Sequence, residues 1–505
     1  MSLRPVPHVS ADALARGQRA LVQDAAWASL TGALYGGVVL VGFALALGAG
    51  PFVIGLLAAI PLIAQSAQLA GIALVERLRQ RKRITVTSVT VSRVIIATLA
   101  VIPFLPATDA RISYLIAVQV TITILGSIAG CALNSWLHQL LPREGLGAFF
   151  AKRLFFATTL SCIGTLAAGY LVDHWTFGER IHAYSVAFLA AACAGFVSSW
   201  FLTRVPEPLM TSAGPVSSIR TKIASPFRDA GFRKVLVYIA GWNAASNLAA
   251  PFVAVYLIKQ LDYSLGTVTT LWVASQVANA LTLYLWGRLS DRLSNKAILA
   301  VALPAYFLAV LALAFVAIPA KHAGTLPALY LVHAVMGAAG GGVSLATGNV
   351  SLKLAPQGHG TSYLAATSLV ASITGGITPI VAGALAQWLE AVKFSILVRW
   401  AWPGRTGEAT VLQFASWEFL FALSAAAGLY VLHALSRIEE GEEISERVVM
   451  QHFALEALRT VNQVSSVGGL LGNVISFGRL IERRLFMRSR AARPSERRSS
   501  ERADV

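Results

Sequence analysis

The sequence predicts an all-α polytopic membrane protein whose twelve transmembrane helices form two pseudo-symmetric six-helix halves. Three observations predict this fold: the composition, the spacing of the apolar runs, and features that recur between the halves. The 505 residues are 56% hydrophobic and only 13% charged, whereas soluble proteins carry about 25% charged residues. So few ionisable groups cannot cover a water-exposed surface. Three cysteines are too few for a secreted disulfide scaffold, and their position in apolar runs is typical of small core residues.

A transmembrane helix needs about 20 mostly apolar residues. Such runs fall at residues 25–48, 51–75, 84–106, 112–138, 154–173, 181–203, 234–260, 265–287, 297–319, 326–354, 362–390 and 416–436. We therefore expect five regions: an N-terminal segment (1–24), a first half (25–203), a proline-containing linker (204–233), a second half (234–436) and a tail (437–505).

The basic residues predict the orientation in the membrane. With the N-terminus inside, cytoplasmic segments hold 33 of the 41 Lys and Arg residues and external links hold 7. The remaining residue, Arg93, lies within a span. This bias predicts cytoplasmic N- and C-termini and a multi-pass protein of the cytoplasmic (inner) membrane. The net charge of +17 therefore indicates anionic lipid as a partner, not nucleic acid. Residues 1–23 lack the apolar core of a signal peptide.

The tail combines an amphipathic segment with an Arg-rich end. Residues 445–486 have apolar side chains at helical spacing, and 12 of the 41 basic residues follow residue 436. The amphipathic part is expected either to lie on the inner membrane surface, with its arginines toward anionic headgroups, or to pack on the cytoplasmic face of the bundle. We expect residues 487–505 to be disordered.

Several features of the first half recur in the second at offsets of 213 to 215 residues. The matched pairs are Trp27 with Trp242, Glu76-Arg77 with Asp291-Arg292, Phe150 with Tyr363, and Trp175 with Trp388. Their common order indicates a duplicated six-helix unit.

The loop between spans eight and nine reads Gly287-Arg288-Leu289-Ser290-Asp291-Arg292. It resembles the cytoplasmic loop motif of the major facilitator superfamily, and the resemblance extends over about residues 20–436. Ser294 and Asn295 stand where that motif has glycine and a basic residue. In the equivalent first-half loop, Ile72 replaces the motif's glycine.

The resemblance implies a secondary transporter whose halves rock about a central site. It also implies that the loop carboxylates act as latches, because a helix N-terminus attracts negative charge. Asp291 is expected to dock on the start of span eleven near residues 360–362, and Glu76 to face the start of span five. The alternative is that these charges only enforce the topology.

Ionisable groups inside a membrane are costly and are therefore functional candidates. Arg93 lies nine residues into span three, ~13 Å deep at 1.5 Å per residue, and no Asp, Glu or Lys is expected at similar depth. It could face a bound anion, bond helix carbonyls, or extend to the inner surface. His333 in span ten could couple transport to protons, or it could be a hydrogen-bonded structural residue.

Amide and aromatic side chains supply the other cavity candidates. Span seven carries Trp242 beside Asn243 and Asn247, which share a helix face, and Pro251 follows, where we expect local unwinding. The remaining candidates are Gln276 and Asn279 in span eight, Gln119 in span four and Tyr35 in span one. The resemblance implies that spans one, four, seven and ten line the cavity. The alternative for each amide is bonding between helices.

The sequence contains no phosphate-binding loop, no metal-ligand spacing and no catalytic triad, so we expect no enzymatic activity, no cofactor and no metal. The predicted function is transport of a small organic anion or amphiphilic metabolite. Proton coupling would then depend on His333, the loop carboxylates or the substrate's own protons. Two alternatives are efflux of hydrophobic compounds and a non-transporting membrane scaffold or assembly factor on the same fold.

Overall fold

The computed structural model describes residues 4–142, 144–210, 225–292, 294–318, 321–356, 360–402 and 405–439. In the first half the helical elements are α1 (Ala11–Tyr35), α2 (Gly37–Ala46), α3 (Pro51–Ala64), η1 (Gln65–Ala67), α4 (Gln68–Leu78), α5 (Arg81–Thr98), η2 (Leu99–Phe104), α6 (Thr108–Leu140), α7 (Leu146–Asp173) and α8 (Ile181–Thr203). Several of these are consecutive pieces of one span, so the half contains six long helical segments.

The second half has the same number of helical segments within the described ranges. They are α10 (Ala230–Val255) with its π-helical end η3 (Tyr256–Gln260), α11 (Leu265–Arg292), α12 (Asn295–Leu313), α13 (Thr325–Lys353), α14 (Gly360–Leu389) and α15 (Ser416–Ser436). Strands β1 (Phe394–Trp402) and β2 (Arg405–Phe414) lie between α14 and α15.

Ten of these helical segments are long and apolar enough to cross a membrane. The other two are α10 and α11, which have 26 and 28 residues and so are long enough, but carry more polar side chains. Ten candidate spans confirm a multi-pass membrane protein. The count of twelve stays a prediction.

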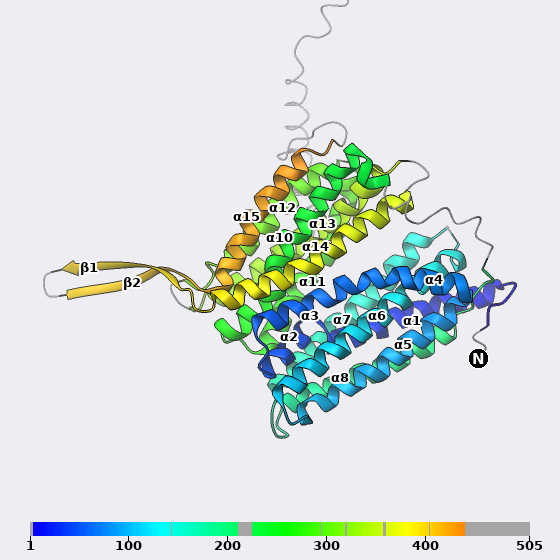
Figure 1. Ribbon diagram of the computed structural model, residues 1–505, viewed down its shortest axis with the longest axis horizontal. Helices are drawn as coiled ribbons and strands as arrows, with labels where there is room; N and C mark the ends of the chain where they lie inside the picture. Colours follow the sequence, from blue (N-terminus) through cyan, green and yellow to red (C-terminus); the bar gives the residue numbers. More distant parts are fainter. Residues whose placement is uncertain are drawn as a thin grey trace, which may run out of the picture.

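The two halves are joined at one end of the bundle. Within the halves, α1 packs on α7 and α8, and α13 packs on α11 and α12; between them, α3 packs on α14 and α7 on α11. Figure 1 shows the two groups of ribbons side by side near the strands and diverging toward the N-terminus. We call these the hairpin end and the N-terminal end.

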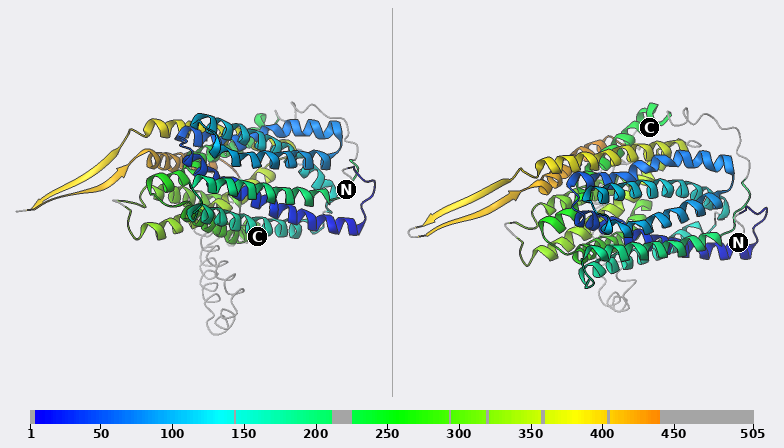
Figure 2. Two further views of the ribbon diagram at one scale, coloured as in Figure 1. Left: turned by 90° about the horizontal axis from the view of Figure 1, so that it is seen from below. Right: turned by 60° about the horizontal axis from the view of Figure 1, so that its bottom comes forward.

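The hairpin corrects the all-α expectation, which treated residues 391–415 as a link. β1 and β2 pair in antiparallel register from Phe394–Phe414 to Trp402–Arg405 and project beyond the bundle (Figure 2). Every second residue of β1 is apolar, and Arg399 pairs with Glu408 on the opposite face. This alternation is typical of a strand. The run is too short for a transmembrane span, so a search for spans does not detect it. All nine residues of β1 are exposed.

At the N-terminal end, the first residues of the linker are fixed to the first half. Glu207, 1% exposed, accepts hydrogen bonds from the backbone N–H and the Nε of Arg81, at 2.6 and 3.4 Å. Trp136 Nε1 donates to Pro206 O at 2.9 Å, and Val6 N to Glu207 O at 2.8 Å. The chain leaving α8 therefore folds back under α5 and α6.

The second half begins with a charged cap. The Oδ1 atom of Asp229 accepts hydrogen bonds from the N–H groups of Gly231 and Phe232, at 2.9 and 3.1 Å, and its Oδ2 accepts one from the hydroxyl of Tyr363 on α14. The bond from Phe232 is the main reason that the pKa of Asp229 lies below its ordinary value. The cap satisfies two otherwise unpaired helix donors and ties α10 to α14.

Two expectations lie outside the described residues. The amphipathic and Arg-rich tail falls almost entirely within residues 440–505, and residues 211–224 of the linker are likewise outside.

Candidate substrate cavity

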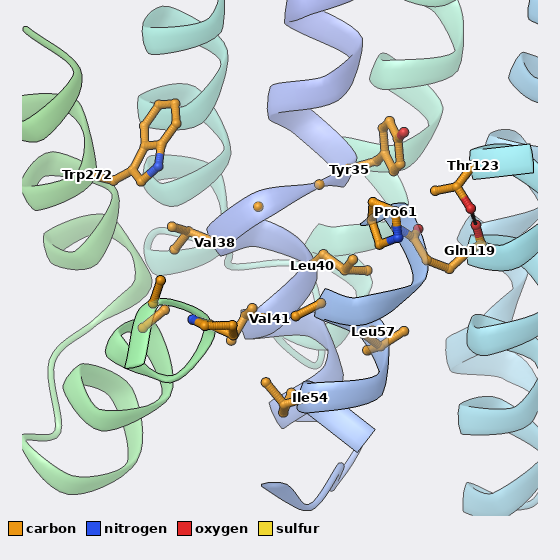
Figure 3. A pocket seen from close by; sticks show the side chains of 16 residues that line it. Tyr35, Val38, Leu40, Val41, Ile54, Leu57, Pro61, Gln119, Thr123 and Trp272 are labelled. Carbon is orange, nitrogen blue, oxygen red and sulfur yellow. Dashed lines mark hydrogen bonds between the residues drawn. The ribbon is translucent and has the colours of Figure 1, made fainter. Parts of the chain in front are cut away.

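A cavity of about 530 Å³ lies between the two halves, and Figure 3 shows the residues that line it. The first half contributes α1, α2, α3 and α6, and the second contributes α10 and α11. The lining residues are Tyr35, Gly36, Gly37, Val38, Leu40, Val41, Ile54, Leu57, Ala58, Pro61, Gln119, Thr123, Ala250, Pro251, Ala254 and Trp272. A volume of this size is typical of small-molecule sites.

A break in the first span shapes one wall of the cavity. α1 ends at Tyr35 and α2 starts at Gly37, whose φ of +53° is a left-handed conformation that suits glycine. The expected unwinding at Pro251 is wrong: α10 runs through Pro251 to Val255 and ends in the π-helical η3. A single missing N–H is tolerated within a helix that neighbouring helices support. The break that borders the cavity lies in span one, at Gly36–Gly37.

The polar atoms of the cavity gather on one side. Figure 3 shows Tyr35, Gln119 and Thr123 near one another, with Trp272 on the opposite wall. The Thr123 hydroxyl donates to the backbone O of Gln119 at 2.7 Å. Gln119 is 5% exposed, and its Oε1 has no hydrogen-bond partner within the described residues. A buried amide oxygen without a partner is costly, so this atom is suited to accept a hydrogen bond from a ligand.

Arg93 is not among the residues that line the cavity. Its side chain packs on Gly195 of α8, where a Cβ would lie 2.6 Å from Nε. That Nε is buried and has no hydrogen-bond partner among the described residues. The guanidinium is close enough to interact electrostatically with Tyr35 and Asp24. Arg93 therefore contributes positive potential near Tyr35 without reaching the cavity surface.

Asp24 corrects the expectation that no carboxylate lies deep in a span. It is 3% exposed and accepts a hydrogen bond from Ser198 Oγ of α8 at 2.7 Å, and it interacts with Arg153 and Arg93. It lies about 16 Å from Tyr35 along α1, at 1.5 Å per residue. Because the residues around Asp24 are polar, the predicted start of span one is residue 25, whereas α1 begins at Ala11.

The span-seven candidates contact other helices and do not line the cavity. Asn243 and Asn247 share a face as expected, and both approach Gly375 of α14, where a Cβ would lie 3.4 Å from Asn243 Oδ1 and 3.5 Å from Asn247 Nδ2. Each Nδ2 donates to a backbone carbonyl one turn earlier, at 2.9 and 2.8 Å. Trp242 packs edge-on against Tyr306 and Phe307 of α12.

The remaining candidates also lie outside the lining. Asn279 Oδ1 lies 3.1 Å from a Cβ placed on Gly341 of α13, and Gln276 is half-buried on the same helix as Asn279. His333 is buried, with Nδ1 2.8 Å from Leu329 O, so Nδ1 carries the proton of this bond. Of the nine predicted cavity residues, the structure therefore brings only Tyr35 and Gln119 together.

The loop residues show no closed latch in the first half. Glu76 and Arg77 are exposed on α4, and no hydrogen bond or ion pair is recorded for Glu76 within the described ranges. α4 packs against α6 and not against α7. The expected contact between Glu76 and the start of span five is therefore absent in this conformation.

In the second-half loop, Gly287 borders open space and Arg288 stacks on Tyr284 at 4.6 Å. Asn349 of α13 donates hydrogen bonds to Ser290 and Asn295 at 2.8 and 3.1 Å, so Asn295 has a structural role. Asp291 and Arg292 belong to α11, but their side chains lie outside the described part of the chain.

Small residues close the cavity toward the hairpin end. A Cβ on Gly55 of α3 would overlap the carbonyl oxygen of Pro379 on α14, and one on Gly169 of α7 would lie 2.9 Å from Gly266 Cα on α11. Backbones this close exclude any side chain. The halves are thus closed at the hairpin end and diverge toward the N-terminal end (Figure 1).

Comparisons with known proteins agree with this architecture. The sequence profile of the Major Facilitator Superfamily matches residues 25–379 and, separately, 244–447. None of the curated proteins matches the chain.

Solved structures share the fold at low identity. The nucleoside transporter NupG superimposes with a TM-score of 0.60 at 12% identity, covering 85% of this chain and 100% of the other. A POT family transporter in complex with a thioalcohol-conjugated peptide gives 0.62 at 11%, covering 84% and 97%. A D-xylose–proton symporter gives 0.61 at 13%, covering 84% and 98%. Together with the profile match and the two-half architecture, these likenesses lead to one conclusion: the chain belongs to the major facilitator superfamily and is a membrane transporter, not an enzyme.

Proposed function

We propose that this transporter moves a small organic anion or amphiphilic metabolite by alternating access, with the inter-half cavity as its substrate site. The observation that carries the proposal is the two-sided lining. Tyr35, Gln119 and Thr123 offer polar atoms on one wall, while the other wall is formed by aliphatic side chains and Trp272. Such a site suits a molecule with a polar head and an apolar body.

Two features favour an anionic or neutral head over a cation. Among the described residues, the lining contains no charged side chain, so the site offers no counter-charge to a cation. The charged group that interacts with Tyr35 is positive, because that group is the guanidinium of Arg93. Asp24 interacts with the same arginine but does not line the cavity. Efflux of lipophilic cations is therefore the less favoured alternative.

The experiment is a thermal-shift screen of the detergent-purified protein against metabolite anions, neutral solutes and lipophilic cations. We expect an anion to raise the melting temperature of the wild type, and Gln119→Leu and Arg93→Ala to weaken that ligand about tenfold. Gln276→Leu is the matched control, because this half-buried amide lies outside the lining. The compound that is found would then be tested for flux in liposomes.

Stabilisation by cationic amphiphiles alone, unchanged in Arg93→Ala, would instead support efflux of hydrophobic compounds. Absence of flux for every stabilising compound would favour a membrane scaffold or assembly factor on the same fold. Removal of the tail separates the two classes further: a transporter should keep its flux without residues 445–505, whereas a scaffold should lose its partner.

A specific observation favours proton coupling through Asp24 over the His333 route. Ionisable residues within membrane helices commonly form proton relays, and Asp24 is buried beside Ser198 and near Arg93. His333 Nδ1 is occupied by a backbone carbonyl. We expect Asp24→Asn to abolish accumulation driven by a pH gradient while substrate exchange across liposomes continues. Ser198→Ala removes the hydrogen bond to Asp24 but keeps the carboxylate, so it is the control for the lost hydrogen bond. Loss of exchange in Asp24→Asn would contradict a pure coupling role.

We also propose that the N-terminal end of the bundle faces the cytoplasm, that the chain crosses the inner membrane twelve times, and that the tail contacts anionic lipid. Two facts support the orientation, and a third supports the number of spans. The links at the N-terminal end carry most of the basic residues, those at the hairpin end carry few, and α10 and α11 are long enough to span. The conformation described here is then the one open to the cytoplasm.

A further inference from the structure

We propose that Asp173 is a latch that holds the two halves together at the hairpin end while the transporter is open at the N-terminal end. This inference rests on the alternating access proposed above and adds the contact that stabilises one of its states. It concerns a residue that contributes nothing to the cavity lining.

The latch is a bond between the two halves. Asp173 is the last residue of α7, and its Oδ2 accepts a hydrogen bond from the backbone N–H of Gly266 at 2.9 Å. Gly266 is the second residue of α11, where the backbone N–H groups have no partner within the helix. The partial positive charge of a helix N-terminus strengthens a bond to a carboxylate. One carboxylate of the first half thus caps a helix of the second half.

The contact requires complete closure of the two helices. A Cβ on Gly266 would overlap the Asp173 carboxylate, and one on Gly169 would lie 2.9 Å from Gly266 Cα. Only with glycine at both positions can α7 approach α11 closely enough for the bond to form. A separation of a few ångströms would break the bond, because hydrogen bonds weaken beyond about 3.2 Å. The bond therefore exists in one conformational state only.

The internal repeat supplies a natural comparison. At an offset of 214 residues, Gly383 of α14 corresponds to Gly169 and Gln387 to Asp173, while Phe52, the second residue of α3, corresponds to Gly266. The second junction is equally close, since a Cβ on Gly383 would lie 3.1 Å from Phe52 Cα. However, the position of Asp173 is occupied there by Gln387, whose side chain carries no charge. The packing is thus repeated at both junctions, whereas the charged cap is present at only one.

At the N-terminal end of the bundle, the contact expected for the first-half loop carboxylate is not made. The exposed Glu76 makes no recorded hydrogen bond or ion pair within the described residues, and α4 stands away from α7. A carboxylate–helix contact is therefore made at the hairpin end while the corresponding first-half loop contact is open. A rocking transition requires that the contact at one end of the bundle forms while the contact at the other end is released.

The test measures conformational populations and not flux. Spin labels on Glu179→Cys and Ala323→Cys report the distance between the halves at the hairpin end, and labels on Leu78→Cys and Leu352→Cys report the N-terminal end. Cys131, Cys162 and Cys193 are first replaced by serine. Asp173→Ala should raise the population with a long hairpin-end distance about tenfold relative to the parent, and shorten the N-terminal-end distance in the same molecules.

Two further variants isolate the charged cap. Gln387→Ala, at the corresponding position of the other junction, should leave both distance distributions unchanged. Asp173→Asn keeps an acceptor oxygen without the charge, so it should change the distance distributions less than Asp173→Ala does. It also replaces Asp173→Ala as the test variant if that protein does not fold. Unchanged distances in both Asp173 variants, or an equal shift in Gln387→Ala, would overturn the latch. A parent whose two distances do not change with any stabilising compound or with pH would instead overturn alternating access itself.

Discussion

Glu207→Ala is expected to lower the free energy of unfolding by about 3 kcal/mol, the largest stability loss that we predict for this chain. The side chains of Glu207 and Arg81 are 0% and 2% exposed, with Nε and Oε1 3.4 Å apart. Removing the carboxylate leaves the guanidinium buried, and its remaining partners among the described residues are the carbonyls of Ser135 and Pro208. It also removes the acceptor for the first N–H of α5. The measurement is the melting temperature in detergent.

Two further variants separate the contribution of the charge to stability from that of the packing. Glu207→Gln keeps an acceptor for the Arg81 N–H and should lose less stability than alanine does. The double variant Arg81→Met with Glu207→Leu removes both charges and should recover most of the loss, because apolar pairs of similar size replace buried ion pairs at little cost. If the double variant were less stable than Glu207→Ala, the loss would come from packing and not from the unpaired charge.

Gly55→Ala is expected to reduce transport about 10- to 100-fold while leaving each half folded. The added methyl group would overlap the carbonyl oxygen of Pro379 and lie 3.0 Å from its carbon. Overpacking of this kind costs about 1–3 kcal/mol, and here the cost falls only on the state in which the hairpin end is closed. The protein should accumulate in the opposite state, which liposome flux and the spin-label distances at the hairpin end would show.

Gly340→Ala is the matched control, because a Cβ at this position of α13 meets no atom within 4 Å. It should transport at the parental rate. The melting temperature of Gly55→Ala should stay near that of the parent, since the contact joins the halves and does not lie inside either of them. A large fall in melting temperature together with lost transport would indicate a folding defect instead of a trapped state.

Much of the architecture could be predicted from the sequence, because spans depend on the length of apolar runs and the halves on a recurring offset. The interruptions were harder to predict. Pro251 has the residue type that breaks helices, yet its helix continues, whereas Gly36–Gly37 carries the break. The difference lies in the packing of neighbouring helices, which a single sequence does not reveal. The hairpin is hard to predict for another reason: its strand period extends only over residues 394–402, which is too short a run to stand out among transmembrane spans.

The residues of the cavity could likewise be predicted only in part. Tyr35 and Gln119 were predicted because the family resemblance identified their spans, and both line the site. Asn243 and Asn247 share a helix face, as their spacing predicted, but that face meets α14. Helical periodicity shows which side chains point the same way and not which neighbour they meet. Trp272 contributes the opposite wall and carried no polar signal that could have selected it.

The projecting hairpin has a practical consequence for work with the isolated protein. Its nine-residue strand β1 extends about 30 Å at 3.3–3.4 Å per residue. Within the part of the chain that the structure describes, each strand pairs with a single neighbour. Both outer edges therefore present free backbone donors and acceptors beside exposed Trp400 and Trp402, the combination that templates strand addition between molecules. A detergent micelle covers the apolar belt of the helices but not a ribbon that extends beyond it. In concentrated preparations, self-association should therefore begin at the hairpin, and a lysine in place of Val398 should delay its onset.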